Sequence, residues 1–371
     1  MLRFLRLLSW LVAAVVLVLL TSCTPREAGD TATATPAPSR TDSLAARAIS
    51  VPLLTDFYTA DPSAHVFDGR LYVYPSHDIE TDLEMNDDGA QFAMRDYRVL
   101  SMDRPDGEVT AHDVALRLED IPWASRQLWA PDAAERNGTY YLYFPARDRD
   151  GRFRVGVAVG EEPAGPFTPD PEPITGAYSI DPAVFVDTDG SYFLYLGGIM
   201  GGQLQKYRDN TYGESNEEPA ADQPALRPVV ARLDTSMRQL AEAPRPVDIL
   251  DENGQPLLAG DHDRRFFEGA WVHHHADRYY LSYSTGDTHY LVYATGDSPY
   301  GPFTYRGRIL EPVEGWTTHH SIVEWQGKWY LFYHDSLLSG GQTHLRSVKM
   351  TELEYTPEGD IKTITPYGAK S

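Results

Sequence analysis

The chain has 371 residues, which allows one large domain or two of ordinary size, and 42% of its residues are hydrophobic, enough for a sizeable core. Its 54 acidic and 32 basic residues give a formal net charge of −22, which disfavours nucleic acid as a partner and disfavours binding to anionic lipid by charge. A single cysteine excludes an intrachain disulfide, and the many Gly, Pro and aromatic residues favour an all-β chain rich in turns.

Residues 1–22 have the features of a secretory signal. Arg3 and Arg6 precede an apolar run, Leu7 to Leu20, that is too short to span a membrane comfortably. The next residues, Thr21-Ser22-Cys23, complete a segment that is similar to the lipobox of bacterial lipoproteins, in which the cysteine is lipidated after cleavage. We therefore expect a secreted lipoprotein whose only link to a membrane is the lipid on Cys23. An ordinary signal peptide followed by a chance cysteine is the alternative.

Residues 23–50 are rich in Thr, Ala, Pro and Ser and show no apolar periodicity. Such a composition is typical of a flexible linker, here one that would hold a domain away from the membrane. Threonine rather than aspartate at position 24 favours the outer membrane, by similarity to lipoprotein sorting in Gram-negative bacteria. The folded domain is then expected over 51–371.

Five segments of this domain share one plan: a short apolar strand, a tight turn and a second strand rich in aromatic residues. They are Asp61–Tyr74, Ala130–Tyr143, Asp181–Tyr195, Glu268–Ser282 and His319–Phe332. Their turns lie about 65 residues apart on average, enough for a four-stranded antiparallel sheet with its loops.

The repeats predict the architecture. Apolar residues on both faces of the strands indicate sheets packed face to face, and five such sheets close into a five-bladed β-propeller. A β-sandwich is the alternative, but it gives no reason for five copies. The long insertion at about 200–262 is expected to be surface loop.

Three of the five repeats begin with a carboxylate: Asp61, Asp181 and Glu268. An Asp-Pro pair at the start of one strand is most often only a turn. Because the innermost strand of each blade lines the centre of a propeller, three carboxylates at equivalent positions are expected to meet around one axial pocket.

Crowding of this kind has a chemical consequence. Carboxyl groups in a partly desolvated pocket cannot all ionise at neutral pH, so one can protonate a leaving oxygen while an ionised one activates water. Glycoside hydrolysis needs this pair, with roughly 6.5–9.5 Å between the carboxyls for inversion and about 5–5.5 Å for retention.

Short motifs accompany these positions. They are Thr59-Ala-Asp61-Pro, Trp129-Ala-Pro-Asp132, Ser179-Ile-Asp181-Pro-Ala-Val-Phe185, Phe267-Glu268-Gly-Ala and His319-His-Ser321. Together they resemble, from about 56 to 350, glycoside hydrolase family 43, the five-bladed-propeller arabinofuranosidases and β-xylosidases. Members of that family invert the anomeric centre and need no cofactor for the chemistry.

The resemblance implies a role for each carboxylate. Asp61 would be the general base, Glu268 the general acid, and Asp181 the group that orients the acid and holds up its pKa. It also implies that Arg346 helps to hold the sugar. His319 stands where the family often places a histidine beside a central Ca²⁺, with His320 as a second candidate, although oxygen ligands dominate calcium sites.

Other side chains are candidates for binding sugar. Trp129 is the first choice for stacking on a sugar ring, followed by Phe67 and Trp271, although packing between blades is the commoner role of such residues. His77 either reaches the rim of the pocket or simply ends a strand. The run His273-His-His275 does not predict zinc, because alternate residues of a strand point to opposite faces.

The leading hypothesis is an inverting exo-glycosidase that removes terminal α-L-arabinofuranosyl or β-D-xylosyl units from plant or algal polysaccharide or oligosaccharide. A surface glycan-binding propeller lipoprotein without catalysis is the alternative, but it does not explain the three carboxylates. A protein-interaction propeller leaves the polar residues at the inner strands unexplained. A retaining fructan-cleaving relative lacks support, because its Trp-x-Asn-Asp-Pro-Asn-Gly entrance is absent.

Overall fold

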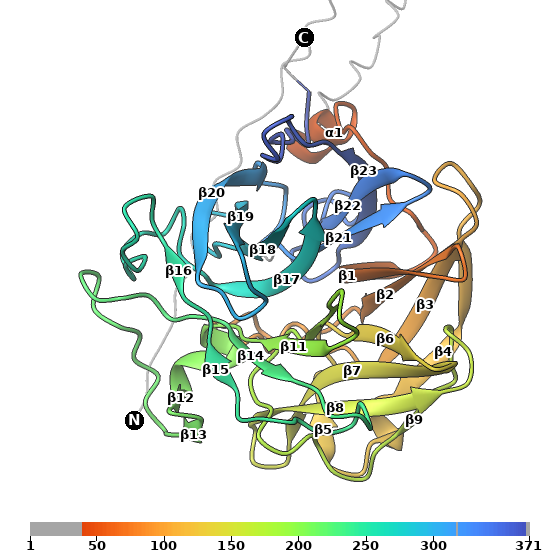
Figure 1. Ribbon diagram of the computed structural model, residues 1–371. Helices are drawn as coiled ribbons and strands as arrows, with labels where there is room; N and C mark the ends of the chain where they lie inside the picture. Colours follow the sequence, from red (N-terminus) through yellow and green to blue (C-terminus); the bar gives the residue numbers. More distant parts are fainter. Residues whose placement is uncertain (1–38, 317, 369–371) are drawn as a thin grey trace, which may run out of the picture. The chain divides into compact units, whose positions relative to one another are not determined.

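The computed structural model describes residues 39–316 and 318–368. The predicted signal peptide, Cys23 and most of the predicted linker lie outside this range. Within it, the strands form five sheets of three to five strands around a common centre, together with one two-stranded ribbon (Figure 1). No helix of the described residues has the length and apolar character that crossing a membrane requires.

The first two sheets follow each other in the chain. The first contains β1 (Tyr58–Phe67), β2 (Arg70–Asp78), β3 (Asp96–Met102) and β4 (Thr110–Arg117). The second contains β5 (Ala124–Arg126), β6 (Asp132–Arg136), β7 (Thr139–Asp148), β8 (Phe153–Gly160) and β9 (Thr168–Pro169). A 3₁₀ turn, η1 (Leu118–Asp120), joins them.

The other three sheets complete the set. The third contains β10 (Ala183–Val186), β11 (Tyr192–Leu196), β14 (Val229–Arg232) and β15 (Arg245–Pro246). The fourth contains β16 (Ile249–Leu250), β17 (Glu268–His275), β18 (Arg278–Ser284), β19 (Leu291–Gly296) and β20 (Phe303–Leu310). The fifth contains β21 (His320–Trp325), β22 (Lys328–Asp335) and β23 (Ser347–Leu353).

The sheets close into a ring. Each innermost strand lies against the next in the order β1, β6, β10, β17 and β21, and β21 lies against β1. The predicted all-β, five-bladed propeller is therefore confirmed, and each of the five sequence repeats supplies the two inner strands of one blade.

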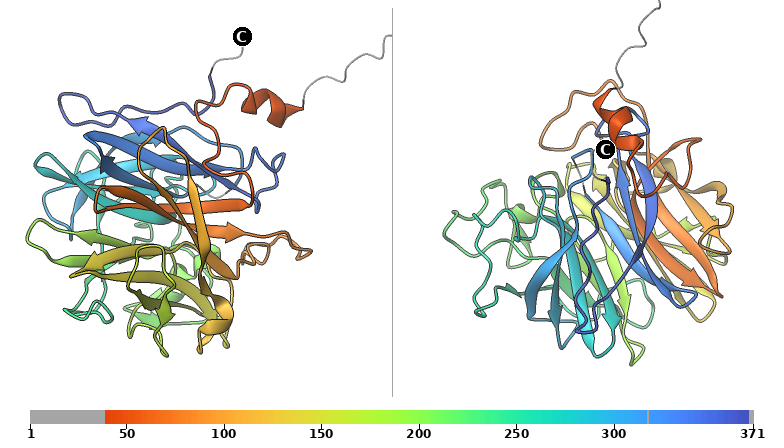
Figure 2. Two further views of the ribbon diagram at one scale, coloured as in Figure 1. Left: turned by 90° about the vertical axis from the view of Figure 1, so that its right-hand side faces the viewer. Right: turned by 90° about the horizontal axis from the view of Figure 1, so that it is seen from above.

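The N-terminal segment completes the last blade. The amide of Leu53 donates to the carbonyl of Val348 at 2.8 Å, and that of Thr59 donates to the carbonyl of Arg346 at 2.9 Å. Pro52 also forms an isolated bridge with Lys349, so the segment that leads into β1 lies beside β23, and Figure 2 shows the orange strands of the first blade beside the blue strands of the last.

Residues 39–50, which lie in the predicted linker, contact the rest of the described chain. Residues Arg40–Ala45 form α1, whose first turn is capped by Ser39. Arg40 pairs with Glu314 at 2.7 Å, and the amide of Ile49 donates to the carbonyl of Pro366 at 3.0 Å. These contacts tie the end of the predicted linker to the C-terminal segment.

The insertion at 200–262 is only partly loop. It contains the short turns η2 (Met200–Gly202) and η3 (Leu204–Lys206) and the ribbon formed by β12 (Tyr207–Arg208) and β13 (Thr211–Tyr212). It also supplies β14 and β15 of the third blade and β16 of the fourth, so the expectation of a surface loop is wrong for these strands.

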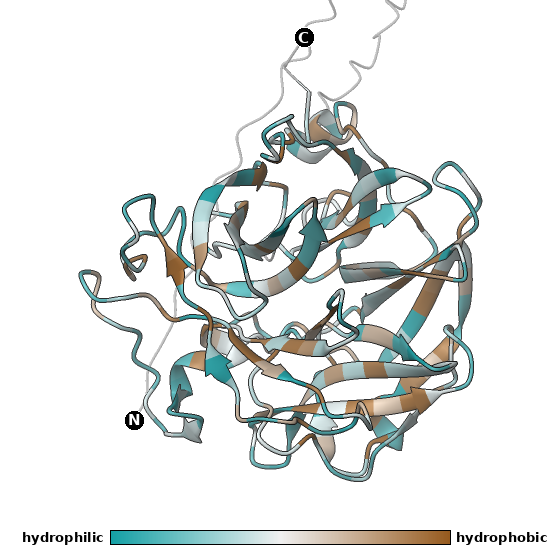
Figure 3. Ribbon diagram, viewed as in Figure 1, coloured by the Kyte–Doolittle hydropathy of each residue, from teal (hydrophilic) through white to brown (hydrophobic). Residues whose placement is uncertain are grey.

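Aromatic side chains join neighbouring blades. The second strand of each of the first three repeats contains a buried tyrosine whose hydroxyl donates to a backbone carbonyl of the next blade: Tyr74 to Pro163 (2.6 Å), Tyr143 to Met237 (2.7 Å) and Tyr195 to Pro299. A buried phenol needs such a partner. The tyrosines therefore fill the spaces between neighbouring sheets and link these sheets by hydrogen bonds. In Figure 3 the hydrophobic colours lie mainly along the strands and the hydrophilic ones mainly in the loops.

Candidate active site

The three carboxylates stand where inner strands depart from regular geometry. Strand β1 bulges between Ala60 and Ser63, and Asp61 within the bulge has φ of 48°. Asp181, just before β10, has φ of 55°. Strand β17 bulges directly after Glu268, at Gly269. Bulges re-aim a side chain, and backbone strain of this kind gathers at functional sites.

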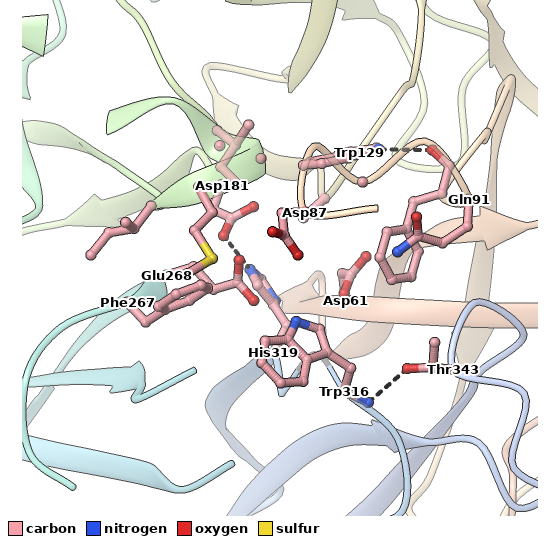
Figure 4. A pocket seen from close by; sticks show the side chains of 18 of the residues that line it. Asp61, Asp87, Gln91, Trp129, Asp181, Phe267, Glu268, Trp316, His319 and Thr343 are labelled. Carbon is pink, nitrogen blue, oxygen red and sulfur yellow. Dashed lines mark hydrogen bonds and ion pairs between the residues drawn. The ribbon is translucent and has the colours of Figure 1, made fainter. Parts of the chain in front are cut away.

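All three carboxylates line one cavity of about 390 Å³. Figure 4 shows Glu268 and Asp181 on one side of it and Asp61 on the other, with His319 and Trp316 between them on the lower wall. The structure therefore brings together the residues that the repeat positions singled out.

Asp61 is held as an anion. Its Oδ1 accepts from Nη1 of Arg346 at 2.7 Å and its Oδ2 accepts from Oγ of Ser76 at 2.7 Å. Burial would raise the pKa of Asp61, but the charge of Arg346, helped by His334, His319 and Ser76, holds that pKa below its usual value.

Arg346 is fixed by a second carboxylate. Its Nε and Nη2 donate to the two oxygens of Asp78 at 2.8 Å each, and its own amide donates to Asp78 at 2.9 Å. Both side chains are buried. The guanidinium thus bridges Asp78 and Asp61. Its two hydrogen bonds to Asp78 fix its orientation, so that Nη1 faces Asp61.

The pKa values of Glu268 and Asp181 are shifted in the opposite direction, upward. Burial, followed by the charge of Asp61, raises the pKa of Glu268 to about 8. Burial and the charge of Glu268 raise the pKa of Asp181 well above its usual range. Asp181 also accepts a hydrogen bond from the amide of Gly269 at 2.9 Å, which anchors the backbone next to Glu268. The cavity therefore holds protonated and ionised carboxyls together at neutral pH.

His319 lies in the cavity wall, 3.7 Å from Asp181. Burial lowers the pKa of His319, and neither ring nitrogen has a hydrogen-bond partner among the described residues. His320 points elsewhere and bonds Ser282 at 2.6 Å. Within 39–316 and 318–368 no three His, Cys, Asp or Glu side chains converge on a metal site. An ion beside His319 would therefore keep most of its shell as water.

Of the sugar-binding candidates, Trp129 and Arg346 line the cavity. The indole of Trp129 packs on Phe153, and its Nε1 donates to the carbonyl of Phe92 at 2.8 Å. This anchoring leaves Trp129 as a fixed apolar wall on which a sugar ring can rest.

Phe67, Trp271 and His77 do not line this cavity. Phe67 packs against Tyr140 between the first two blades. Trp271 is core, with its Nε1 donating to the carbonyl of Ile322 at 2.9 Å. His77 bonds Asp96 at 2.6 Å. Their apolar or paired surroundings correct the expectation that they reach the pocket.

Sequence reasoning missed several wall residues that come from loops. They are Met85, Asn86, Asp87, Gln91 and Phe92 from the loop between β2 and β3, Met200 from η2, and Trp316 and Thr343 from the last blade. Asp87 adds a fourth carboxylate to the cavity (Figure 4). Met85, Met200 and Trp316 are exposed hydrophobic side chains, and this exposure beside the cavity is the signal that could have drawn attention to them.

Comparison with known proteins agrees with this geometry. The family model described as "Glycosyl hydrolases family 43" matches residues 52–361. The chain is 62% identical to the xylosidase/arabinosidase 43A of Humicola insolens, over 85% of this chain and 99% of that protein. It is 57% identical to a xylosidase/arabinosidase of Bacteroides ovatus, over 83% and 95%.

A solved structure is similar over the same region. The β-xylosidase/α-arabinofuranosidase CoXyl43 from a compost microbial metagenome, in complex with xylotriose and in a calcium-free form, has a TM-score of 0.86 and 61% identity. The match covers 87% of this chain and 99% of that one. Together with the match of the family model, these relatives show that the chain belongs to glycosyl hydrolase family 43 and is a glycosidase.

Proposed function

We propose that this protein is an inverting exo-glycosidase that removes terminal β-D-xylosyl or α-L-arabinofuranosyl units from plant or algal oligosaccharide or polysaccharide. The observation that carries the proposal is the cavity in which the pKa of Asp61 is lowered while that of Glu268 is raised to about 8. The names of the relatives, xylosidase/arabinosidase, supply the sugar class.

The two pKa shifts assign the proton transfers. Glu268 is protonated at neutral pH and gives its proton to the glycosidic oxygen as the bond from that oxygen to the anomeric carbon breaks. A water attacks the same carbon from the opposite side, and Asp61 takes its proton. The product sugar carries the new C–O bond with inverted configuration, and exchange with solvent returns the protons to their starting places.

Asp181 and Arg346 act as positioning residues in this proposal. Asp181 holds the amide of Gly269 and so fixes the backbone that carries Glu268. The charge of Glu268 raises the pKa of Asp181, so the two buried carboxyls resist being ionised together, which supports a protonated group at this side of the cavity. Arg346 keeps Asp61 ionised and oriented, since Asp78 holds the other edge of its guanidinium.

Hydrolysis of a panel of 4-nitrophenyl pentosides and of xylotriose tests the proposal, with the anomer of the first product read by proton NMR. We expect release of xylose or arabinose with the anomeric configuration opposite to that of the substrate. Release of the retained anomer would contradict the roles of Asp61 and Glu268. Binding of xylotriose without any sugar release would favour the glycan-binding alternative.

We further propose that any ion at the centre of the ring is a hydrated Ca²⁺ held on the protein side by His319 and that it has no part in the chemistry. The unpartnered ring nitrogens of His319 support a polar neighbour there. Dialysis against EDTA should leave kcat on 4-nitrophenyl xyloside unchanged and lower only the temperature of unfolding. A loss of kcat that CaCl₂ restores would contradict this.

Lipidation of Cys23 and anchoring to the outer membrane also remain proposals, supported by the sequence of residues 1–24. In a Gram-negative host the full chain should sediment with outer-membrane vesicles and incorporate labelled palmitate, whereas Cys23→Ala should do neither. Equal incorporation of label by both chains would contradict the proposal.

A further inference from the structure

Arg147, near the end of β7, is a buried cation that joins two segments of the central cavity's wall. It is only 2% exposed and does not itself line the cavity. Its Nη2 donates to the carbonyl of Asp88 at 2.8 Å and to that of Gly201 at 3.3 Å. Asp88 lies in the loop between β2 and β3, and Gly201 lies in η2. One guanidinium of the second blade therefore connects a loop of the first blade to a turn that follows β11 of the third.

The loop between β2 and β3 forms much of the cavity wall yet has little structure of its own. Residues 79–95 contain no strand and no helix. A loop without regular pairing depends on individual contacts for its position and opens more easily than a strand. Figure 4 shows that the loop directs the carboxylate of Asp87 into the cavity and places Gln91 on the side away from Phe267 and Glu268. Contacts that hold this loop therefore shape the cavity.

The loop, η2 and Trp129 pack closely together. A Cβ added at Gly89 would lie 2.6 Å from Cη2 of Trp129, and one added at Gly201 would lie 3.1 Å from the same atom. The guanidinium of Arg147 also lies over Phe153, with Cζ 4.7 Å from the ring centroid, and Phe153 packs on Trp129. Trp129 is thus surrounded by groups that Arg147 contacts directly or through one neighbour.

The contacts of Arg147 require the geometry of a guanidinium. Nη1 donates to the carbonyl of Gly151 at 3.2 Å, and Nη2 also forms an ion pair with the carboxylate of Asp88 at 2.9 Å. A planar fork of donors reaches acceptors in several directions at once, whereas the ammonium of lysine is a single compact charge. Lysine at position 147 would therefore keep the charge but lose part of the connection between the loop and η2.

A buried amide connects the same loop to the second blade. Gln127 is 5% exposed and does not line the cavity, and its Nε2 donates to the carbonyl of Gly89 at 2.8 Å. The second blade thus holds the loop at two successive residues, through Arg147 at Asp88 and through Gln127 at Gly89. Gln127 therefore offers an independent way to loosen the loop.

We propose that Arg147 is a positioning residue for the glycosidase: it holds the loop between β2 and β3, together with η2, as walls against which the sugar binds. It touches no substrate and acts through Asp88, Gly201 and Trp129. Because these walls contact the sugar in the ground state and in the transition state alike, loosening them weakens binding more than it slows the chemistry. The inference rests on the proposed function for the choice of substrate.

Steady-state kinetics on 4-nitrophenyl β-D-xyloside tests the effect on binding. In Arg147→Lys and in Gln127→Met, KM should rise about three- to tenfold, as expected for a lost hydrogen bond, while kcat changes by less than about twofold. The inhibition constant of xylose, the product, should rise by the same factor as KM.

Hydrogen exchange read by mass spectrometry tests the effect on the loop and needs no substrate. Peptides from residues 79–95 should exchange about three- to tenfold faster in both variants, because loss of a hydrogen bond favours local opening. Peptides from β18 and β22, in the fourth and fifth blades, should exchange as in the unmodified chain.

Two matched variants serve as controls. Arg245→Lys changes an arginine of β15 that also stacks on an aromatic ring, that of Tyr300 at 3.9 Å. Gln326→Met changes a glutamine that has a positive φ, as Gln127 does, and donates to the carbonyl of Asp103 at 2.9 Å. Neither control residue lines the central cavity. Both controls should leave KM and the exchange of residues 79–95 unchanged.

The outcomes separate positioning from a purely structural role. If either KM or the exchange of residues 79–95 is unchanged in both Arg147→Lys and Gln127→Met, the proposal is overturned, whatever happens to the unfolding temperature. A fall in kcat at constant KM overturns it as well. If Arg147→Lys fails to fold, Gln127→Met alone decides the matter. An unmodified chain that cleaves no pentoside overturns instead the proposed function, and the exchange measurement still tests the hold on the loop.

Discussion

Asp61 and Glu268 are carboxylic acids in one cavity, yet their surroundings shift their pKa values in opposite directions. Asp61 accepts hydrogen bonds from Arg346 and Ser76, whereas no charge-neutralising partner contacts Glu268 among the described residues. The difference supports the proposed roles of Asp61 as base and Glu268 as acid, because hydrogen bonds to the charged form lower a carboxyl pKa and burial raises it.

Replacing Glu268 by Gln should remove the acid. On xylotriose we expect kcat to fall by about 10²- to 10⁴-fold, and on 4-nitrophenyl xyloside by less, because nitrophenolate leaves without full protonation. In the unmodified chain kcat/KM should fall as pH rises through about 8, since Glu268 must stay protonated, and Glu268→Gln should lack this alkaline limb. Steady-state kinetics between pH 4 and 10 measures both effects.

Glu354→Gln is the control for this variant. Glu354 is an exposed glutamate paired with Lys362, and its replacement should leave the rate and the pH profile unchanged. An equal loss of kcat on both substrates in Glu268→Gln, with the alkaline limb intact, would show that another group is the acid.

Replacing Ser76 by Ala should move the acidic limb of the pH–activity profile to higher pH. Ser76 is fully buried and donates to the charged form of Asp61, so its loss raises the pKa of Asp61. Because the base must be ionised, activity is lost as pH falls through this pKa, and the loss should begin at a higher pH in Ser76→Ala. Ser101→Ala, an equally buried serine of the first blade, should leave the limb in place. An acidic limb that does not move in Ser76→Ala contradicts the assignment of Asp61 as base.

How far the sequence could predict the cavity depends on whether a residue belongs to the repeat. Asp61, Asp181 and Glu268 could be found because they occupy equivalent strand starts, and the family resemblance pointed to Arg346. Asp78 could not be found, because nothing in its local sequence shows that its carboxylate meets Arg346, 268 residues away. Phe67 and Trp271 were misplaced because aromatic residues serve packing and sugar binding alike.

Among the strands, two with β-bulges hold the proposed catalytic carboxylates. The bulges in β1 and β17 interrupt the ladder just where Asp61 and Glu268 stand, so that each side chain can face the centre of the ring. The repeats predicted the two inner strands of each blade because these alternate with tight turns. The two-residue strands β15 and β16 lie inside the insertion and are too short to give a periodic signal.

Replacing Gly269 by Ala tests the bulge of β17. Gly269 has φ of +67°, and an added Cβ would lie 2.9 Å from Cδ2 of His319. The substitution combines backbone strain with a clash and displaces the amide that Asp181 accepts from. We expect the free energy of unfolding to fall by roughly 1–3 kcal/mol and kcat to fall by about tenfold or more.

Gly138→Ala separates strain from displacement of the site. Gly138 has φ of +78° in the turn between β6 and β7, and nothing lies within 4 Å of an added Cβ. Urea denaturation should show a loss of about 1 kcal/mol with kcat unchanged. If Gly269→Ala behaves like Gly138→Ala, the bulge does not position Glu268.

At the scale of the whole molecule, the first and last blades of the propeller join beside the candidate active site. The segment 52–59 joins β23, and the ion pair between Asp61 and Arg346 links the first blade to the last. Ala64 donates to Oγ of Ser321 at 3.0 Å across the same junction. Closure of the ring and alignment of the base therefore depend on the same set of contacts.

Shortening the chain should show this dependence. A chain that begins at residue 51 keeps the pairing of Pro52 and Leu53 with β23, whereas one that begins at residue 57 loses it. We expect the shorter chain to unfold roughly 5 °C or more below the longer one, with a matching loss of kcat. Differential scanning fluorimetry and kinetics on 4-nitrophenyl xyloside measure the two. Equal unfolding temperatures would contradict a stabilising role for the contacts of Pro52 and Leu53 with β23.

The ion pair between Asp61 and Arg346 joins residues 285 positions apart in the chain. On the ribosome, the proposed base emerges long before the arginine that lowers its pKa, so we expect a nascent polypeptide to cleave no sugar until its final blade has been made. We expect a chain cut short ahead of position 346 to be inactive, because it lacks the partner of Asp61.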